Sequence, residues 1–230
     1  MRGKLIVIEG GDGAGKATQT KKLVERLEAE GHEVKLISFP QYDTASAAMV
    51  EAYLRGDFGP KENFSPYAAS VLYAHDRFEA RDRLEEWLAS GTVVVADRYV
   101  TSNRAHQGAR IDDPKERKIF LEWLDDLEHV KLGLPRPDIV IILEAEAKLR
   151  DINVGKKDAR NYLRGQKKDI HEGDLPYQQR VDRVYHELTI SQADHVRVNC
   201  MDDEGNLLPM DVCHGKIWSL VEKVVSKNYA

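Results

Sequence analysis

The feature that most constrains this chain is a glycine-rich loop between a short apolar run and a helical pattern. Residues 5–9 are mostly aliphatic, and residues 10–16 read G-G-D-G-A-G-K, which fits the pattern G-x-x-x-x-G-K. Glycines let successive backbone N–H groups turn toward a phosphate, and the lysine reaches the outer phosphates. Leu23, Val24 and Leu27 follow at helical spacing, and Gly31 is expected to end that helix. The pattern predicts a phosphate-binding loop between a strand and a helix.

Four more short apolar runs predict further strands, at residues 34–39, 92–96, 139–144 and 196–200. Amphipathic stretches separate them, and this alternation is typical of a parallel sheet covered by helices. One long helix is expected from Ser65-Pro66 to Gly91, another from Pro114, and a last one capped by Asp211. We therefore expect an α/β fold with a five-stranded parallel sheet.

A basic stretch interrupts this pattern. Residues 148–168 contain eight basic and two acidic residues, with few apolar positions. We interpret the segment as a mobile lid over about residues 146–172, within a single domain that spans residues 1–230.

Composition excludes several classes of protein. The longest aliphatic run, residues 139–143, is far shorter than the roughly 20 residues that cross a bilayer. A net charge of −5 argues against a protein that wraps duplex nucleic acid. The first residues are too quickly acidic for a signal peptide, and two cysteines, Cys200 and Cys213, cannot form a disulfide framework. We expect a cytoplasmic protein with neither a membrane nor a nucleic acid as its partner.

The residue after Lys16 departs from the usual motif. Ala17 stands where a Ser or Thr hydroxyl ordinarily binds Mg²⁺, and Thr18 points about 100° away on a helix. In one interpretation, which we favour, other ligands or a water replace the hydroxyl. In the other, the chain binds nucleotides without turning them over.

Two signatures together resemble those of thymidylate kinases. Residues 9–16 read E-G-G-D-G-A-G-K, close to E-G-x-D-G-x-G-K, and residues 97–108 read D-R-Y-V-T-S-N-R-A-H-Q-G, close to D-R-Y-x-x-S-x-x-A-Y-Q-G. The resemblance extends to F-P at 39–40, L-Y-A-H-D-R at 72–77 and D-I-H-E at 169–172. It implies a three-layer P-loop kinase fold, transfer of the γ-phosphoryl group of ATP to thymidine monophosphate with Mg²⁺, and a homodimer.

The resemblance also implies roles for individual residues. Asp12 would contact the 3′-hydroxyl and phosphate region of the acceptor, and Tyr73 would stack on thymine while Arg77 reaches the base or phosphate. Asn103 has a carboxamide that can donate to O4 of thymine and accept from N3–H. The expected residues are, for catalysis, Asp12, Lys16, Arg98 and Arg164; for ATP, Gly10, Gly11, Asp12, Gly13, Ala14, Gly15, Lys16, Ala17 and Thr18; for the acceptor, Asp12, Phe39, Tyr73, Arg77, Arg98, Ser102, Asn103, His106 and Gln107; and for Mg²⁺, Asp97, directly or through water.

Some positions leave alternatives open. Arg164 is preferred as the lid arginine over Arg150 and Arg160, because Arg164-Gly165 precedes the acidic segment as in family lids. His106 replaces the usual tyrosine near the sugar. Another pyrimidine nucleotide or nucleoside kinase of the same fold is the nearest rival, whereas a GTPase switch is disfavoured because no N-K-x-D motif is found.

Overall fold

The sheet has the five strands predicted from the sequence, and they run parallel as expected. The computed structural model describes residues 2–146, 150 and 174–226. All neighbouring strands pair in parallel, in the order β2-β3-β1-β4-β5. The strands are β1 Leu5–Gly10, β2 Val34–Ser38, β3 Val93–Asp97, β4 Ile139–Glu144 and β5 His195–Asn199. Five apolar runs in the sequence therefore identified the five strands of this sheet, each end within about one residue, the scatter usual for such boundaries.

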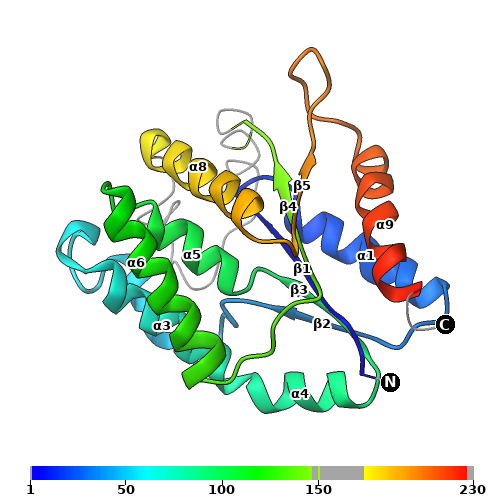
Figure 1. The fold of residues 1–230 in the computed structure, drawn as a ribbon, viewed down its shortest axis with the longest axis horizontal. Coiled ribbons are helices and arrows are strands. Elements are labelled where there is room, and N and C mark those ends of the chain that lie inside the picture. Colours follow the sequence, from blue (N-terminus) through cyan, green and yellow to red (C-terminus); the bar gives the residue numbers. More distant parts are fainter. Residues whose placement is uncertain (1, 147–149, 151–173, 227–230) are drawn as a thin grey trace.

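Helices cover both faces of the sheet and make three layers (Figure 1). Ile6 and Ile8 of β1 pack toward α1 (Lys16–Ala29) and α9 (Met210–Ser226). Leu5 and Val7, on the opposite face, pack toward a layer that consists of α4 (Arg81–Ala89), α5 (Val100–Gly108) and α8 (Leu175–Ser191). All four side chains are fully buried. Alternate residues of β1 thus serve two cores, which is why Leu5, Ile6, Val7 and Ile8 are all apolar.

The remaining helices form an outer group on the side of α5. They are α2 (Ala48–Arg55), the 3₁₀ turn η1 (Lys61–Asn63), α3 (Pro66–Glu79), α6 (Pro114–Asp125) and the π-helical turn η2 (Asp126–Lys131). Pro is the first residue of α3 and of α6, where its missing N–H costs nothing, and the preceding Ser65 and Asp113 cap the two helices.

Two helix predictions were wrong in detail. The single helix expected from Ser65 to Gly91 is two helices, because the amide of Ala80 bonds to the carbonyl of Arg77 and the buried Ala80 joins α3 to α4. Asp211 is not the cap of the last helix. It lies in the first turn of α9, which begins one residue earlier, and pairs there with Lys22 at 2.7 Å. A carboxylate in a first turn is still favourable to the helix dipole.

The strand register brings the predicted site together. β1 lies between β3 and β4, with Ile8 opposite Asp97 and Gly10 opposite Leu143. The phosphate loop and Asp97 therefore both lie at the carboxyl-terminal ends of their strands, where parallel α/β folds bind ligands. The lid predicted at 146–172 lies outside the described residues except for Glu146 and Arg150. In the described ranges, no helix has the length and apolar character to cross a membrane.

Candidate active site

The loop after β1 has the geometry of a phosphate-binding loop. Gly10 has φ 136°, and a Cβ there would lie 2.5 Å from the carbonyl oxygen of Leu143, so only glycine fits between β1 and β4. Gly15 has φ 88° and precedes α1, whose first N–H groups have no side-chain cap among the described residues. Lys16 is buried, and its Nζ donates to the carbonyl oxygens of Gly10 at 2.9 Å and Gly11 at 3.0 Å. Backbone donors and an ammonium group thus lie on one loop.

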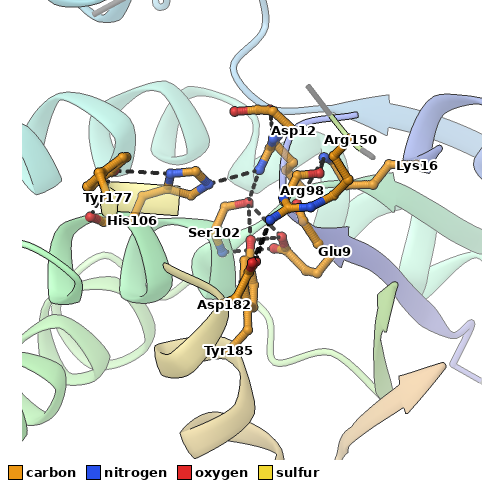
Figure 2. Close-up of polar contacts among 12 residues, drawn as sticks. Glu9, Asp12, Lys16, Arg98, Ser102, His106, Arg150, Tyr177, Asp182 and Tyr185 are labelled. Carbon is orange, nitrogen blue, oxygen red and sulfur yellow. Dashed lines mark hydrogen bonds and ion pairs between the residues drawn. The ribbon is translucent and has the colours of Figure 1, made fainter. Parts of the chain in front are cut away.

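Arg98 connects this loop to α5 (Figure 2). Its guanidinium donates to the carboxylate of Asp12 and, at 2.9 Å, to Oγ of Ser102. Burial alone would lower the pKa of Arg98, but the neighbouring Asp12, Tyr185 and Glu9 raise it well above the ordinary value. The backbone of Arg98 has φ 68°, an unfavourable conformation for a side chain of this size. The strained turn after β3 therefore holds a permanent cation beside the phosphate loop.

Glu9 is the buried anchor of this arrangement, with no exposed surface. Its Oε1 accepts from the backbone N–H groups of Tyr99 at 2.8 Å and Ser102 at 2.9 Å. Its Oε2 accepts from Oγ of Ser102 at 2.6 Å and Oη of Tyr185 at 3.0 Å. Burial, followed by the charge of Glu9, raises the pKa of Tyr185 well above its usual value, so the phenol stays a donor. Glu9 thereby ties β1, α5 and α8 together below the loop.

In the sequence, Glu9 stands out only as part of a motif, and Tyr185 does not stand out at all. The glutamate could have been found as a charged residue at the end of an otherwise apolar strand. Nothing in the sequence marks Tyr185, because its helix α8 follows the unpatterned basic segment.

His106 faces Arg98 from α5. Its Nε2 lies 3.4 Å from a guanidinium nitrogen of Arg98, which can only donate, so Nε2 accepts and Nδ1 carries the hydrogen. Nδ1 lies 3.2 Å from Oη of Tyr177, and that hydroxyl donates to the backbone carbonyl of His106 at 3.1 Å. The histidine ring is therefore held from both sides, by a cation on one and a phenol of α8 on the other (Figure 2).

Arg150 lies directly over the phosphate loop. A Cβ built on Gly11 would meet the guanidinium of Arg150 at 1.2 Å, so the glycine is what admits this side chain. One guanidinium nitrogen binds both oxygens of Asp182, at 2.6 and 2.7 Å (Figure 2). The other two nitrogens are buried and meet no acceptor among the residues that the structure describes. The sequence favours Arg164 over Arg150 as the lid arginine, but Arg160 and Arg164 lie outside the described residues.

Asp97 has the environment that a magnesium ligand requires. Its Oδ1 is buried and has no hydrogen-bond partner in the described part of the chain. Mg²⁺ binds oxygen ligands and is usually held by one or two carboxylates together with substrate phosphates. Ala17 offers no ligand and Thr18 is exposed. Within the described ranges, no three or more Asp, Glu, His or Cys side chains gather in a group that could hold a metal ion.

A second polar cluster lies between α3, α5 and η2. Arg77 is 2% exposed, and its Nε and Nη2 donate to the two oxygens of Glu128 at 2.5 and 2.6 Å. Burial opposes the charge of Arg77, but Glu128 raises its pKa above the usual value. Asn103 Nδ2 donates to Glu128 at 3.0 Å and to the carbonyl of Ser70 at 3.1 Å. Glu128 was missed because no motif surrounds a residue on a π-helical turn.

The other expected acceptor residues are more dispersed. Tyr73 is half-buried at the contact of α2 and α3. Phe39 is 3% exposed and packs on the ring of Tyr99 at 5.7 Å. Gln107 is 1% exposed and accepts from Arg110 at 2.8 Å. The structure thus joins Asp12, Lys16, Arg98, Ser102 and His106 in one cluster and Arg77 with Asn103 in another.

A parallel sheet whose central strand ends in this loop, with a lysine on the loop and cations around it, defines a P-loop nucleotide-binding protein.

Comparisons with known proteins narrow the class to one family. The family model described as thymidylate kinase matches residues 8–203, and the chain belongs to the thymidylate kinase family, whose members are nucleoside monophosphate kinases. A thymidylate kinase of Mycobacterium tuberculosis is 37% identical over 187 residues, which cover 80% of this chain and 85% of the relative. A human thymidylate kinase is 35% identical over 145 residues, 63% of this chain and 62% of the relative.

The fold comparison agrees. A solved thymidylate kinase from Candida albicans superposes with a TM-score of 0.72 at 25% identity and covers 100% of this chain and 94% of its own.

Proposed function

We propose that this chain transfers the γ-phosphoryl group of ATP to thymidine monophosphate, with the residues of the two clusters described above. The observation that carries the proposal is the convergence of Lys16, Arg98 and Arg150 from three different segments on the loop after β1. Three cations around one glycine-rich loop suit a reaction between two phosphate-bearing anions. The rival pyrimidine kinases of this fold are expected to differ at the base and sugar contacts, so Asn103, Tyr73 and His106 are the positions that discriminate between them.

The proposed transfer depends on the placement of the two phosphate groups and on neutralisation of their charge more than on a general base. The second pKa of a phosphate monoester is about 6, so the acceptor is largely ionised at neutral pH without a general base. The transferring group spreads its negative charge over its equatorial oxygens, which favours fixed cations around it. In the proposed roles, Lys16 binds the ATP phosphates, Arg98 orients the acceptor phosphate, and Asp12 holds Arg98 and meets the sugar side of the acceptor. Arg150 neutralises negative charge on the transferring phosphoryl group. Arg164 remains the catalytic arginine that we propose for the lid.

Asp97 is the proposed residue that holds Mg²⁺, directly or through a water. The bound ion supplies charge neutralisation on the phosphates. The buried unpaired oxygen of Asp97 supports this role and supports the interpretation in which Ala17 is a tolerated departure.

The acceptor base is proposed to lie against Tyr73 and Phe39 and to be read by Arg77 and Asn103, with His106, Ser102 and Gln107 toward the sugar and phosphate. Asn103 Oδ1 supports this, because it is buried and meets no donor in the described residues. A buried acceptor without a partner is costly unless a ligand satisfies it.

The test is ADP formation from Mg-ATP with single acceptors: thymidine, deoxyuridine, uridine, deoxycytidine and adenosine monophosphates, and thymidine. We expect fast turnover with thymidylate, shared at most with deoxyuridylate. Lys16→Ala should abolish transfer, whereas Lys21→Ala, an exposed lysine further along α1, should not. ATP binding without turnover for every acceptor would instead favour the non-catalytic interpretation of Ala17.

We also propose that the chain is a homodimer built as one domain per protomer. The support is the exposed apolar side chains on α3 and α6, namely Tyr67 at 40%, Val71 at 47% and Ile119 at 62% exposed. Tyr67 contacts the ring of Phe120 at 5.1 Å, so these side chains border one face. Light scattering on the purified protein tests this. We also propose the cytoplasmic compartment that the sequence predicts.

A further inference from the structure

A fully buried carboxylate on the π-helical turn η2 holds two residues that come from two other helices. Glu128 has no exposed surface and accepts from Arg77 of α3 and from Asn103 of α5. We propose that Glu128 determines the selectivity of the enzyme for the acceptor base, by fixing which end of the Asn103 carboxamide faces the base. The inference rests on the proposed function, in which Asn103 and Arg77 read that base.

The contacts of Asn103 allow only one amide orientation. Both hydrogens of Nδ2 are engaged, one with Oε1 of Glu128 at 3.0 Å and one with the carbonyl oxygen of Ser70 at 3.1 Å. A flipped amide would bring Oδ1 against a carboxylate oxygen and a carbonyl oxygen, which are acceptors only. The negative charge of Glu128 makes that alternative especially unfavourable. Oδ1 is therefore the end that is left for a ligand.

An amide that presents only its oxygen separates the pyrimidine bases. Thymine and uracil carry a hydrogen on N3 and can donate to Oδ1 of Asn103, whereas N3 of cytosine is an acceptor and meets Oδ1 unfavourably. Donation from Asn103 to O4 of thymine, expected from the sequence as an additional contact, has no hydrogen left in this arrangement. A site that hydrogen-bonds one base discriminates strongly against a base that cannot make the same bond, because a buried polar group of the site then stays unpaired.

The same carboxylate orients Arg77. The guanidinium has five N–H donors, and the paired contact at 2.5 and 2.6 Å uses one on Nε and one on Nη2. The planar fork is thereby fixed, with its Nη1 edge turned away from Glu128. This edge is the proposed donor to O4, the position at which cytosine carries an amino group instead. One buried charge thus sets both a donor and an acceptor for the base.

The local backbone explains why Glu128 reaches this place. α6 ends at Asp125, and η2 continues as a wider π-helical turn over Asp126–Lys131. A π-helical turn changes the direction of its side chains relative to an α-helix and is often found at functional sites. His129, next in sequence, bonds to the carbonyl of Leu134 at 2.9 Å and ties the turn to the following segment.

The experiment compares kcat/KM for thymidylate and deoxycytidylate, and the Kd of each, in three proteins. In Glu128→Gln, the new amide can donate to Oδ1 of a flipped Asn103, so the preference for thymidylate should fall roughly tenfold to hundredfold, as for the loss of one charge-assisted hydrogen bond. The matched control is Glu122→Gln on α6, an exposed glutamate paired at 3.8 Å with exposed Lys118. The preference of the control should equal that of the wild type.

The outcomes separate a selectivity role from a structural one. An unchanged preference in Glu128→Gln, or an equal loss for both acceptors, would overturn the inference while the proposed function stands. A wild type without preference for thymidylate would overturn both. If Glu128→Gln does not fold, as judged by circular dichroism, Glu128→Asp decides in its place. The aspartate side chain is one methylene group shorter, so its carboxylate cannot hold Arg77 and Asn103 together. A reduced preference for thymidylate then supports the inference, and an unchanged preference contradicts it.

Discussion

Replacing Glu9 by glutamine tests whether this buried carboxylate anchors the site. The side chain keeps its size, so the change isolates the charge and one acceptor. The amide oxygen of the variant can still accept from the N–H groups of Tyr99 and Ser102. Its NH₂ group then faces the hydroxyls of Ser102 and Tyr185, which donate to Glu9 in the native protein at 2.6 and 3.0 Å. Both hydroxyls must turn around to accept.

The size of the effect follows from the four contacts. Hydrogen bonds to a charged group contribute about 1.5–3 kcal/mol each and neutral ones about 0.5–1.5 kcal/mol. Two contacts are weakened and two must be rearranged, so we expect Glu9→Gln to lower the free energy of unfolding by about 2–3 kcal/mol. Because Ser102 also accepts from Arg98 at 2.9 Å, kcat should fall as well, by about tenfold if one positioning hydrogen bond is lost.

Urea unfolding at neutral pH, followed by circular dichroism, measures the first quantity, and ADP formation measures the second. The control is Glu25→Gln on the exposed face of α1, which removes the same charge and should change stability by less than about 0.5 kcal/mol. If Glu9→Gln is as stable as this control, the reasoning about a charged anchor is refuted.

Three further predictions concern the metal, the loop cation and the partly exposed ion pair between Asp125 and Arg136. Ala17→Ser should lower the Mg²⁺ concentration for half-maximal rate, and an unchanged requirement would show that the hydroxyl is not needed. Arg150→Gln should lower kcat by about a hundredfold, as for the loss of one donor to developing charge, whereas Arg136→Gln, far from the loop in sequence and exposed, should not. A hydrogen bond from Arg136 lowers the pKa of Asp125, so this carboxylate stabilises the fold above the ordinary aspartate pKa and loses that contribution as pH falls through the lowered value. Asp125→Asn should therefore cost about 1 kcal/mol at neutral pH and progressively less in acid, and a cost that persists in acid during thermal unfolding would contradict the assignment.

Local patterns identified much of the fold and part of the site. Short apolar runs flanked by turn residues are enough to find buried parallel strands, because such strands need apolar side chains on both faces. The phosphate loop was predicted for a similar reason, since its backbone conformation requires glycine at Gly10 and Gly15. The lysine that follows belongs to the same contiguous segment. These features depend on neighbours in sequence, so the sequence alone determined them.

Only the tertiary structure decided which side chains pair with the buried carboxylates. Glu128 is 25 residues from Asn103 and 51 from Arg77, and nothing local in the sequence pairs them. Tyr185 reaches Glu9 across 176 residues. A carboxylate in the interior must find its hydrogen-bond donors wherever packing brings them, because an unpaired buried charge is too costly to keep. Such partners are set by the way the helices pack on the sheet, and packing is a property of the whole chain and not of any segment of it.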